Sequence, residues 1–196
     1  MEAIDSMVFY SPGRTNNYPD KPIYNGYRYH FLGGGDEVGN VGIIFEGKRE
    51  NRLLIDYGIA PTKPPKYPLE SPLVKNAIIT HSHVDHIGMV PWLSANYNTK
   101  LHGTSLTAEI SRMMWNDSYK ISNIEKYPLP WDKRDIDNAM DSWEIHDFEK
   151  PWNQNEWQLK LSNSGHIPGA AMLNITTENK KILVTGDFDS RNSPLT

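Results

Sequence analysis

The sequence predicts a single domain of the α/β or α+β class. Strand-like patterns occupy both ends of the chain, and helix-like spacing of apolar residues lies between them. A length of 196 residues is enough for one hydrophobic core. Aromatic residues make up 11% of the chain and charged residues 22%, which is typical of a folded protein rather than a disordered one.

Strands dominate the first part of the chain. Residues 1–27 are rich in Tyr, Pro and Asn, so we expect an irregular N-terminal extension with a short strand at Met7–Tyr10. Five prolines between Ile59 and Pro72 predict an extended surface loop. Apolar or alternating runs predict four strands in this part of the chain: Tyr29–Leu32, Val41–Glu46, Leu53–Tyr57 and Asn76–Thr80.

Helical spacing begins after the fourth strand. Apolar residues recur on one face from Ile87, with Pro91 in the first turn of that helix. A second apolar stripe predicts a helix over Ser105–Tyr119, which Thr104 or Ser105 would cap. The remaining expected elements are one short helix and four strands: Asp135–Met140, then Trp143–Phe148, Glu156–Leu161, Met172–Thr176 and Lys181–Thr185.

Composition excludes several classes of function. The chain has no cysteine, which removes disulfides, thiolate nucleophiles and zinc–cysteine sites. Its mean hydropathy is −0.61 and it has no long apolar run, so no membrane partner is expected. The first residues lack the pattern of a secretory signal, and we therefore expect a cytoplasmic protein. The net charge of −4, without a basic stripe, argues against non-specific nucleic-acid binding.

One short segment, HSHVDHIG, has the clearest pattern of metal-binding residues. His81 and His83 are two residues apart directly after a strand, so on an extended backbone they point the same way and can hold one metal ion. Asp85 and His86 lie where the strand gives way to a helix and can turn towards a second ion. These nitrogen and oxygen ligands predict two neighbouring cation sites, with zinc as the expected metal and Mn²⁺ or Fe allowed.

Other segments offer further ligands. His166 follows a strand and precedes a Pro-Gly turn, and Asp187 ends another strand just past a glycine. The two oxygens of Asp187 can reach two separate ions. Asp56 closes the strand LLIDY and can accept the distal N–H of a histidine ligand. The other histidines, His30, His102 and His146, stand alone in the sequence and are interpreted as structural or surface residues.

Four segments of the chain, in order, resemble the motifs of the metallo-β-lactamase fold: LLIDYG, HSHVDHIG, SGHIPGAAM and TGDFDSR. Three more resemble the β-CASP subgroup of that family: FLGGGDEVGN, MVPWL and MMWNDSYKISNI. Within the subgroup the chain is most similar to the endonuclease subunit of cleavage and polyadenylation specificity factor and to prokaryotic RNA-processing relatives. The resemblance covers Arg28 to about Leu195 and implies the N-terminal portion of an αββα sandwich in residues 28–196.

The resemblance implies a zinc-dependent ribonuclease of the type that processes mRNA 3′ ends. It assigns His81, His83 and His166 to one zinc ion, and Asp85 and His86 to the other. Asp187 would bridge both ions, Asp56 would support a histidine ligand, and Asp85 would also orient the nucleophile. The implied reaction is hydrolysis of a phosphodiester by a hydroxide held between the two zinc ions.

The resemblance also implies that parts of the family are missing here. The β-CASP domain and a final histidine ligand would follow Asp187, and only nine residues do. We therefore expect an N-terminal fragment that binds metal weakly and hydrolyses little or no RNA alone, because single-stranded RNA would be held mainly by the missing domain. A homodimer and association with processing-complex subunits are both open as assemblies.

Three alternative functions remain on the sequence alone. The first is a small-molecule hydrolase of the same fold that acts on a thioester, a lactone or a cyclic phosphodiester. The second is a DNA repair nuclease of the β-CASP group. The third is a non-catalytic scaffold subunit, against which the retention of all six ligand positions argues.

Overall fold

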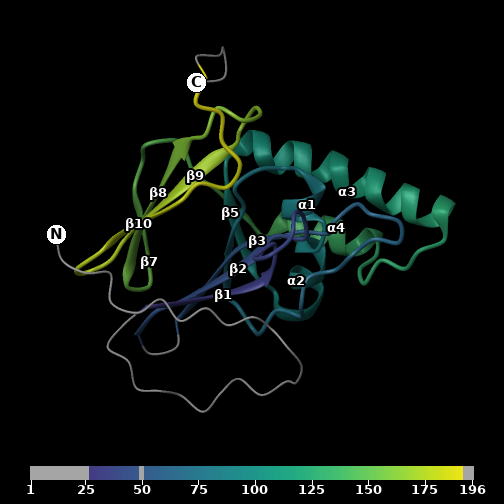
Figure 1. Ribbon diagram of the computed structural model, residues 1–196, viewed down its shortest axis with the longest axis horizontal. Coiled ribbons are helices and arrows are strands. Elements are labelled where there is room, and N and C mark those ends of the chain that lie inside the picture. The colour runs from purple at the N-terminus through teal and green to yellow at the C-terminus, as the bar shows by residue number, and fades with distance from the viewer. Residues whose placement is uncertain (1–26, 49–50, 192–196) are drawn as a thin grey trace.

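A computed structural model of the chain describes residues 27–48 and 51–191. Two sheets and four helices make up this part of the chain (Figure 1). The first sheet has the strand order β1-β2-β3-β4-β5-β6 and contains β1 Arg28–Gly33, β2 Gly42–Glu46, β3 Arg52–Tyr57, β4 Asn76–Ile78, β5 Lys100–Gly103 and β6 Trp143–Ile145. The second has the order β10-β9-β8-β7 and contains β7 Trp152–Gln154, β8 Trp157–Asn163, β9 Ala171–Thr176 and β10 Lys181–Val184. The helices are α1 Val84–Ile87, α2 Val90–Tyr97, α3 Ser105–Glu125 and α4 Lys133–Asp141.

The elements form three layers. The helices gather on one side of the six-stranded sheet, and the four-stranded sheet lies on the other side (Figure 1). Alternation along β3 explains this arrangement, because successive side chains of a strand point to opposite faces. Leu54 belongs to the core under the helices, whereas Leu53 and Ile55 belong to the core between the two sheets. Within the described residues no helix covers the outer face of the four-stranded sheet, so an αββ part of the expected αββα sandwich is present.

Strand direction changes within the six-stranded sheet. The pairs β1–β2 and β2–β3 are antiparallel, whereas β3–β4, β4–β5 and β5–β6 are parallel. Parallel strands are buried on both faces, which fits the apolar LLI of β3 and AII after Asn76. The loops that follow β3 and β4 therefore leave the same edge of the sheet, and this edge carries the histidine-rich segment.

Two tryptophans fix the short helix that carries part of that segment. Trp115 of α3 donates its indole N–H to the carbonyl oxygen of Ile87, at 2.9 Å. Trp131, just before α4, donates to the carbonyl oxygen of Gly88, at 2.8 Å. Both indoles are buried, so these bonds satisfy two carbonyls at the end of α1 that the helix itself leaves unpaired.

Most predicted elements are confirmed, with several differences. The helical spacing from Ile87 belongs to two helices, α1 and α2, and the predicted strand Asn76–Thr80 ends at Ile78. The predicted helix Ser105–Tyr119 continues to Glu125, and Thr104 caps it by accepting from the Thr107 amide. The predicted strand Trp143–Phe148 ends at Ile145. Strands β5 and β7 were not predicted, because four and three residues are too few to establish an alternation. The predicted strand Met7–Tyr10 lies outside the described residues. No described helix is both long and apolar enough to cross a membrane.

A close backbone approach requires glycine at position 58. A Cβ atom there would lie 1.6 Å from the carbonyl oxygen of Asp85, far inside van der Waals contact. Because both atoms belong to backbone, Gly58→Ala should push α1 away from β3 and lower the free energy of unfolding by about 3 kcal/mol or more. Thermal or denaturant unfolding measures the effect. Gly35→Ala is the matched control, since its Cβ would meet only the Phe31 side chain at 3.0 Å. Equal stabilities of the two variants would contradict the prediction.

Candidate metal centre

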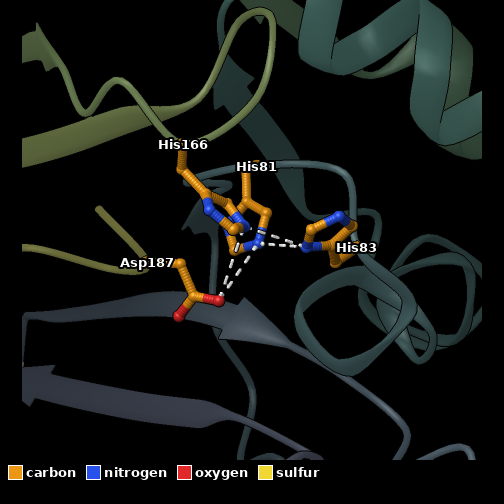
Figure 2. Close-up of side chains that lie close together, drawn as sticks. All are labelled: His81, His83, His166 and Asp187. Carbon is orange, nitrogen blue, oxygen red and sulfur yellow. Dashed lines mark hydrogen bonds and ion pairs between the residues drawn. The ribbon is translucent and has the colours of Figure 1, made fainter. Parts of the chain in front are cut away.

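Three loops bring four of the six predicted ligands to one place. The loop after β4 carries His81 and His83, the loop between β8 and β9 carries His166, and the loop after β10 carries Asp187. One ligand atom from each of these four residues lies within 4.8 Å of the others. Figure 2 shows the three imidazoles and the carboxylate pointing towards a common centre. The first sheet thus supplies two of the four side chains, and the second sheet supplies the other two.

The histidine nitrogens stand close together. His81 Nε2 lies 3.1 Å from His83 Nδ1, and His166 Nε2 lies 3.2 Å from the same His83 atom. Zinc–nitrogen bonds of 2.0–2.1 Å in a tetrahedral site would place neighbouring ligand nitrogens about 3.3 Å apart. The observed spacing therefore fits three imidazoles around a single zinc-sized ion.

Asp187 faces two sets of histidines with its two oxygens. Its Oδ2 atom lies 3.6 Å from His166 Nε2 and 3.9 Å from His81 Nε2. Its Oδ1 atom lies 3.6 Å from His86 Nε2. With this division each oxygen could bind a separate ion.

Asp56 organises the buried side of the centre. It is the last but one residue of β3 and adopts the left-handed region at φ 55°, which Asp tolerates better than most residues, and it is 2% exposed. His86 Nδ1 donates to Asp56 Oδ2 at 2.7 Å, which leaves His86 Nε2 with its lone pair towards Asp187. Thr80 donates to both carboxylate oxygens, from its amide at 2.8 Å and its hydroxyl at 2.6 Å. The carboxylate therefore fixes a histidine tautomer that suits a metal ligand.

Thr80 is a site residue that the sequence analysis missed. Because its hydroxyl proton is used by Asp56, its oxygen can accept from His81 Nδ1 at 3.1 Å, which leaves His81 Nε2 unprotonated. Its carbonyl oxygen accepts from the amide of Ala171 in β9, at 2.8 Å, and so joins the two sheets beside the centre. The sequence did offer one clue. Thr80 ends the apolar run NAIIT, and a hydroxyl group buried there needs hydrogen-bond partners.

The electrostatics favour neutral, metal-binding imidazoles at two positions. Burial, with repulsion from His86, lowers the pKa of His81 to about 3. Burial and the neighbouring His166 also lower the pKa of His83. Burial alone would lower the pKa of His86, but the carboxylate of Asp56 more than offsets this and the pKa is raised. Unprotonated nitrogens that face one point repel one another, and a cation at that point removes the repulsion.

Asp85 and His86 lie outside the tightest cluster. His86 borders this cluster, because its Nε2 atom lies 3.6 Å from Asp187 Oδ1. Asp85 stands in the first turn of α1, and its charge favours the protonated forms of His83, whose pKa is nevertheless lowered, and of His86, whose pKa is raised. Their assignment to a second ion stays a prediction, as do the ligand roles of His81, His83, His166 and Asp187.

His102 and His146, interpreted above as structural or surface residues that stand alone in the sequence, lie side by side in the structure. His102 Nδ1 lies 3.0 Å from His146 Nε2, and Glu144 lies beside both. His102 lies in β5 and His146 directly follows the neighbouring strand β6, 44 positions further along the chain, a pairing that spacing alone does not reveal.

Comparison with known proteins identifies the family. The sequence profile described as "Metallo-beta-lactamase superfamily" matches residues 34–195. The chain belongs to the metallo-beta-lactamase superfamily. A solved metallo-beta-lactamase of Cronobacter sakazakii with a HARLDQ motif shares the fold: the TM-score is 0.54 at 16% identity, over 84% of this chain and 60% of that one. The predicted fold class is therefore confirmed.

Relatives of known name lie among RNA-processing proteins. The chain is 32% identical to "RNase aCSPSF2" of Saccharolobus solfataricus, over 83% of this chain and 33% of that protein. It is 32% identical to "Cleavage and polyadenylation specificity factor 73" of Drosophila melanogaster, over 80% of this chain and 24% of that protein. It is 28% identical to "Cleavage and polyadenylation specificity factor subunit 3-I" of Arabidopsis thaliana, over 80% of this chain and 24% of that protein. The predicted resemblance is confirmed, and this superfamily member spans a quarter to a third of the length of these relatives.

Proposed function

We propose that the chain is the metal-binding part of a ribonuclease that hydrolyses RNA phosphodiester bonds with two zinc ions. The observation that carries the proposal is the position of Asp187, whose two oxygens divide between His81 and His166 on one side and His86 on the other. A single metal ion does not need this division, whereas a pair of ions does. The ribonuclease named among the relatives supports RNA as the substrate.

The donor set fits two zinc-class ions. Imidazole nitrogens and carboxylate oxygens suit zinc and also manganese or iron. Bound as a pair, such ions would activate a water molecule and stabilise negative charge on the phosphate oxygens. In this chain Asp56 would hold His86 in the required tautomer, and Asp85 would orient the attacking water.

A small phosphodiester tests the centre without requiring an extended RNA groove. The chain loaded with zinc or manganese should hydrolyse bis(p-nitrophenyl) phosphate, lose that activity in a chelator and regain it when metal is returned. With labelled oligonucleotides, we expect slow cleavage of single-stranded RNA and less cleavage of DNA of the same sequence. Hydrolysis of a thioester or lactone without hydrolysis of the diester would contradict the proposal and favour a small-molecule hydrolase.

A further inference from the structure

We propose that His102, Glu144 and His146 form an additional site for one zinc-class cation, separate from the centre built by His81, His83, His166 and Asp187. None of its residues belongs to that centre. The three ligand atoms of this His–Glu–His cluster lie within 4.8 Å of one another, as do the four ligand atoms of the main centre.

The register of two parallel strands creates the cluster. His102 of β5 is the partner of Glu144 in β6, and Gly103 is the partner of Ile145. The chain continues the pairing one step beyond β6, where the His146 amide donates to the Gly103 carbonyl oxygen at 2.9 Å. Glu144 and His146 are two residues apart on extended backbone and therefore point to the same face, towards His102.

The distances match those of the main centre. His102 Nδ1 lies 3.0 Å from His146 Nε2, compared with 3.1 and 3.2 Å for the nitrogen pairs around His83. Glu144 Oε2 lies 3.6 Å from His102 Nδ1, as Asp187 Oδ2 does from His166 Nε2. Two imidazoles and one carboxylate are a ligand set of zinc sites that keep a fourth position open.

Neighbouring groups leave the facing atoms of His102 and Glu144 unprotonated and able to bind a cation. Asn76 Oδ1 accepts from His102 Nε2 at 3.0 Å, which places the proton there and leaves the lone pair of Nδ1 facing His146. His102 is fully buried, and burial lowers its pKa to about 4, so the ring is neutral near pH 7. Lys100 binds Glu144 Oε1, lowers the pKa of this carboxyl group and leaves Oε2 towards His102.

The surroundings hold His146 in place and leave one side open. The Trp152 indole stacks on the His146 ring, with 3.7 Å between ring centroids and 15° between planes. Glu144 keeps 41% of its side chain exposed, so a cation can enter from solvent. A cavity of about 120 Å³ borders His146 on the side of residues 104–106 and residues 147–148.

Zinc stoichiometry of the whole chain tests the proposal. Equilibrium dialysis against saturating zinc, followed by elemental analysis, should find one zinc fewer per chain in His146→Gln and in Glu144→Gln than in the unaltered protein. The same loss should appear when His146→Gln is added to an Asp187→Asn background, because the two sites share no residue. Calcium and magnesium should not fill the site, since these hard cations prefer all-oxygen ligands.

His30→Gln is the matched control. His30 faces Glu46 with 3.7 Å between Nε2 and Oε2, and it belongs to neither of the metal-ligand clusters in the described part of the chain. This variant should keep the full zinc content. Circular dichroism and the melting temperature without metal would show that each variant is folded. Equal zinc content in the folded His146→Gln variant and the unaltered protein would overturn the proposal and leave the cluster as a hydrogen-bonded pair of histidines.

Discussion

Asp187→Asn should remove most phosphodiesterase activity, by a factor on the order of 10³, and lower the zinc content of the main centre. The amide replaces one carboxylate oxygen by an N–H donor, which repels a cation, and it removes the negative charge that two ions would share. Asp187 is 50% exposed, so stability without metal should stay within about 0.5 kcal/mol of the unaltered protein. Hydrolysis of bis(p-nitrophenyl) phosphate and elemental analysis provide the two measurements.

Asp189→Asn is the matched control for this experiment. Asp189 lies two residues further along the same loop, and its carboxylate binds the Arg191 guanidinium, with Nη2 to Oδ2 at 2.6 Å. Losing this exposed pair should change activity and zinc content little. A similar loss of activity in both variants would mean that loop structure, rather than the bridging carboxylate, explains the effect.

Asp56→Asn should destabilise the protein and weaken metal binding together. The carboxylate accepts three hydrogen bonds, two from Thr80 and one from His86, and it is almost fully buried. An amide cannot accept with both of its ends, so at least one buried donor loses its partner at a cost of about 3 kcal/mol in unfolding free energy. Zinc affinity should fall about 10- to 100-fold, because the His86 tautomer is no longer fixed.

Two substitutions of Thr80 separate the hydrogen bonds from the packing. Thr80→Ser keeps the hydroxyl that donates to Asp56 and should preserve zinc affinity, whereas Thr80→Val keeps the shape but loses that bond. Denaturant unfolding and zinc titration would measure both effects. If Asp56→Asn left zinc affinity unchanged, Asp56 would have a structural role alone.

Much of the fold could be predicted from the sequence because its longest elements have clear periodicity. β3 is a run of apolar residues, and α3 carries an apolar stripe with a threonine cap. Segments such as Lys100–Gly103 were missed because their strand structure depends on pairing with neighbours that the sequence does not show. The extension of α3 to Glu125 was missed for a related reason: its last residues are polar or exposed.

The main centre was partly predictable because two of its side chains are close in sequence. His81 and His83 lie two residues apart in one short segment, so the local backbone alone suggests a metal site. The contribution of Thr80 and the approach of Gly58 to Asp85 depend on tertiary packing. The His–Glu–His cluster depends entirely on the register between β5 and β6, which spacing in the sequence cannot provide.

The origin of the ligands in both sheets has a consequence for how the domain responds to metal. Ions held by His81 and His83 from one sheet and by His166 and Asp187 from the other would cross-link the two halves of the sandwich. Metal binding and the apolar packing between the sheets are then thermodynamically linked, so each stabilises the other by the same free energy. Anything that loosens this packing weakens coordination, and chelation in turn lowers the resistance of the sheets to separation.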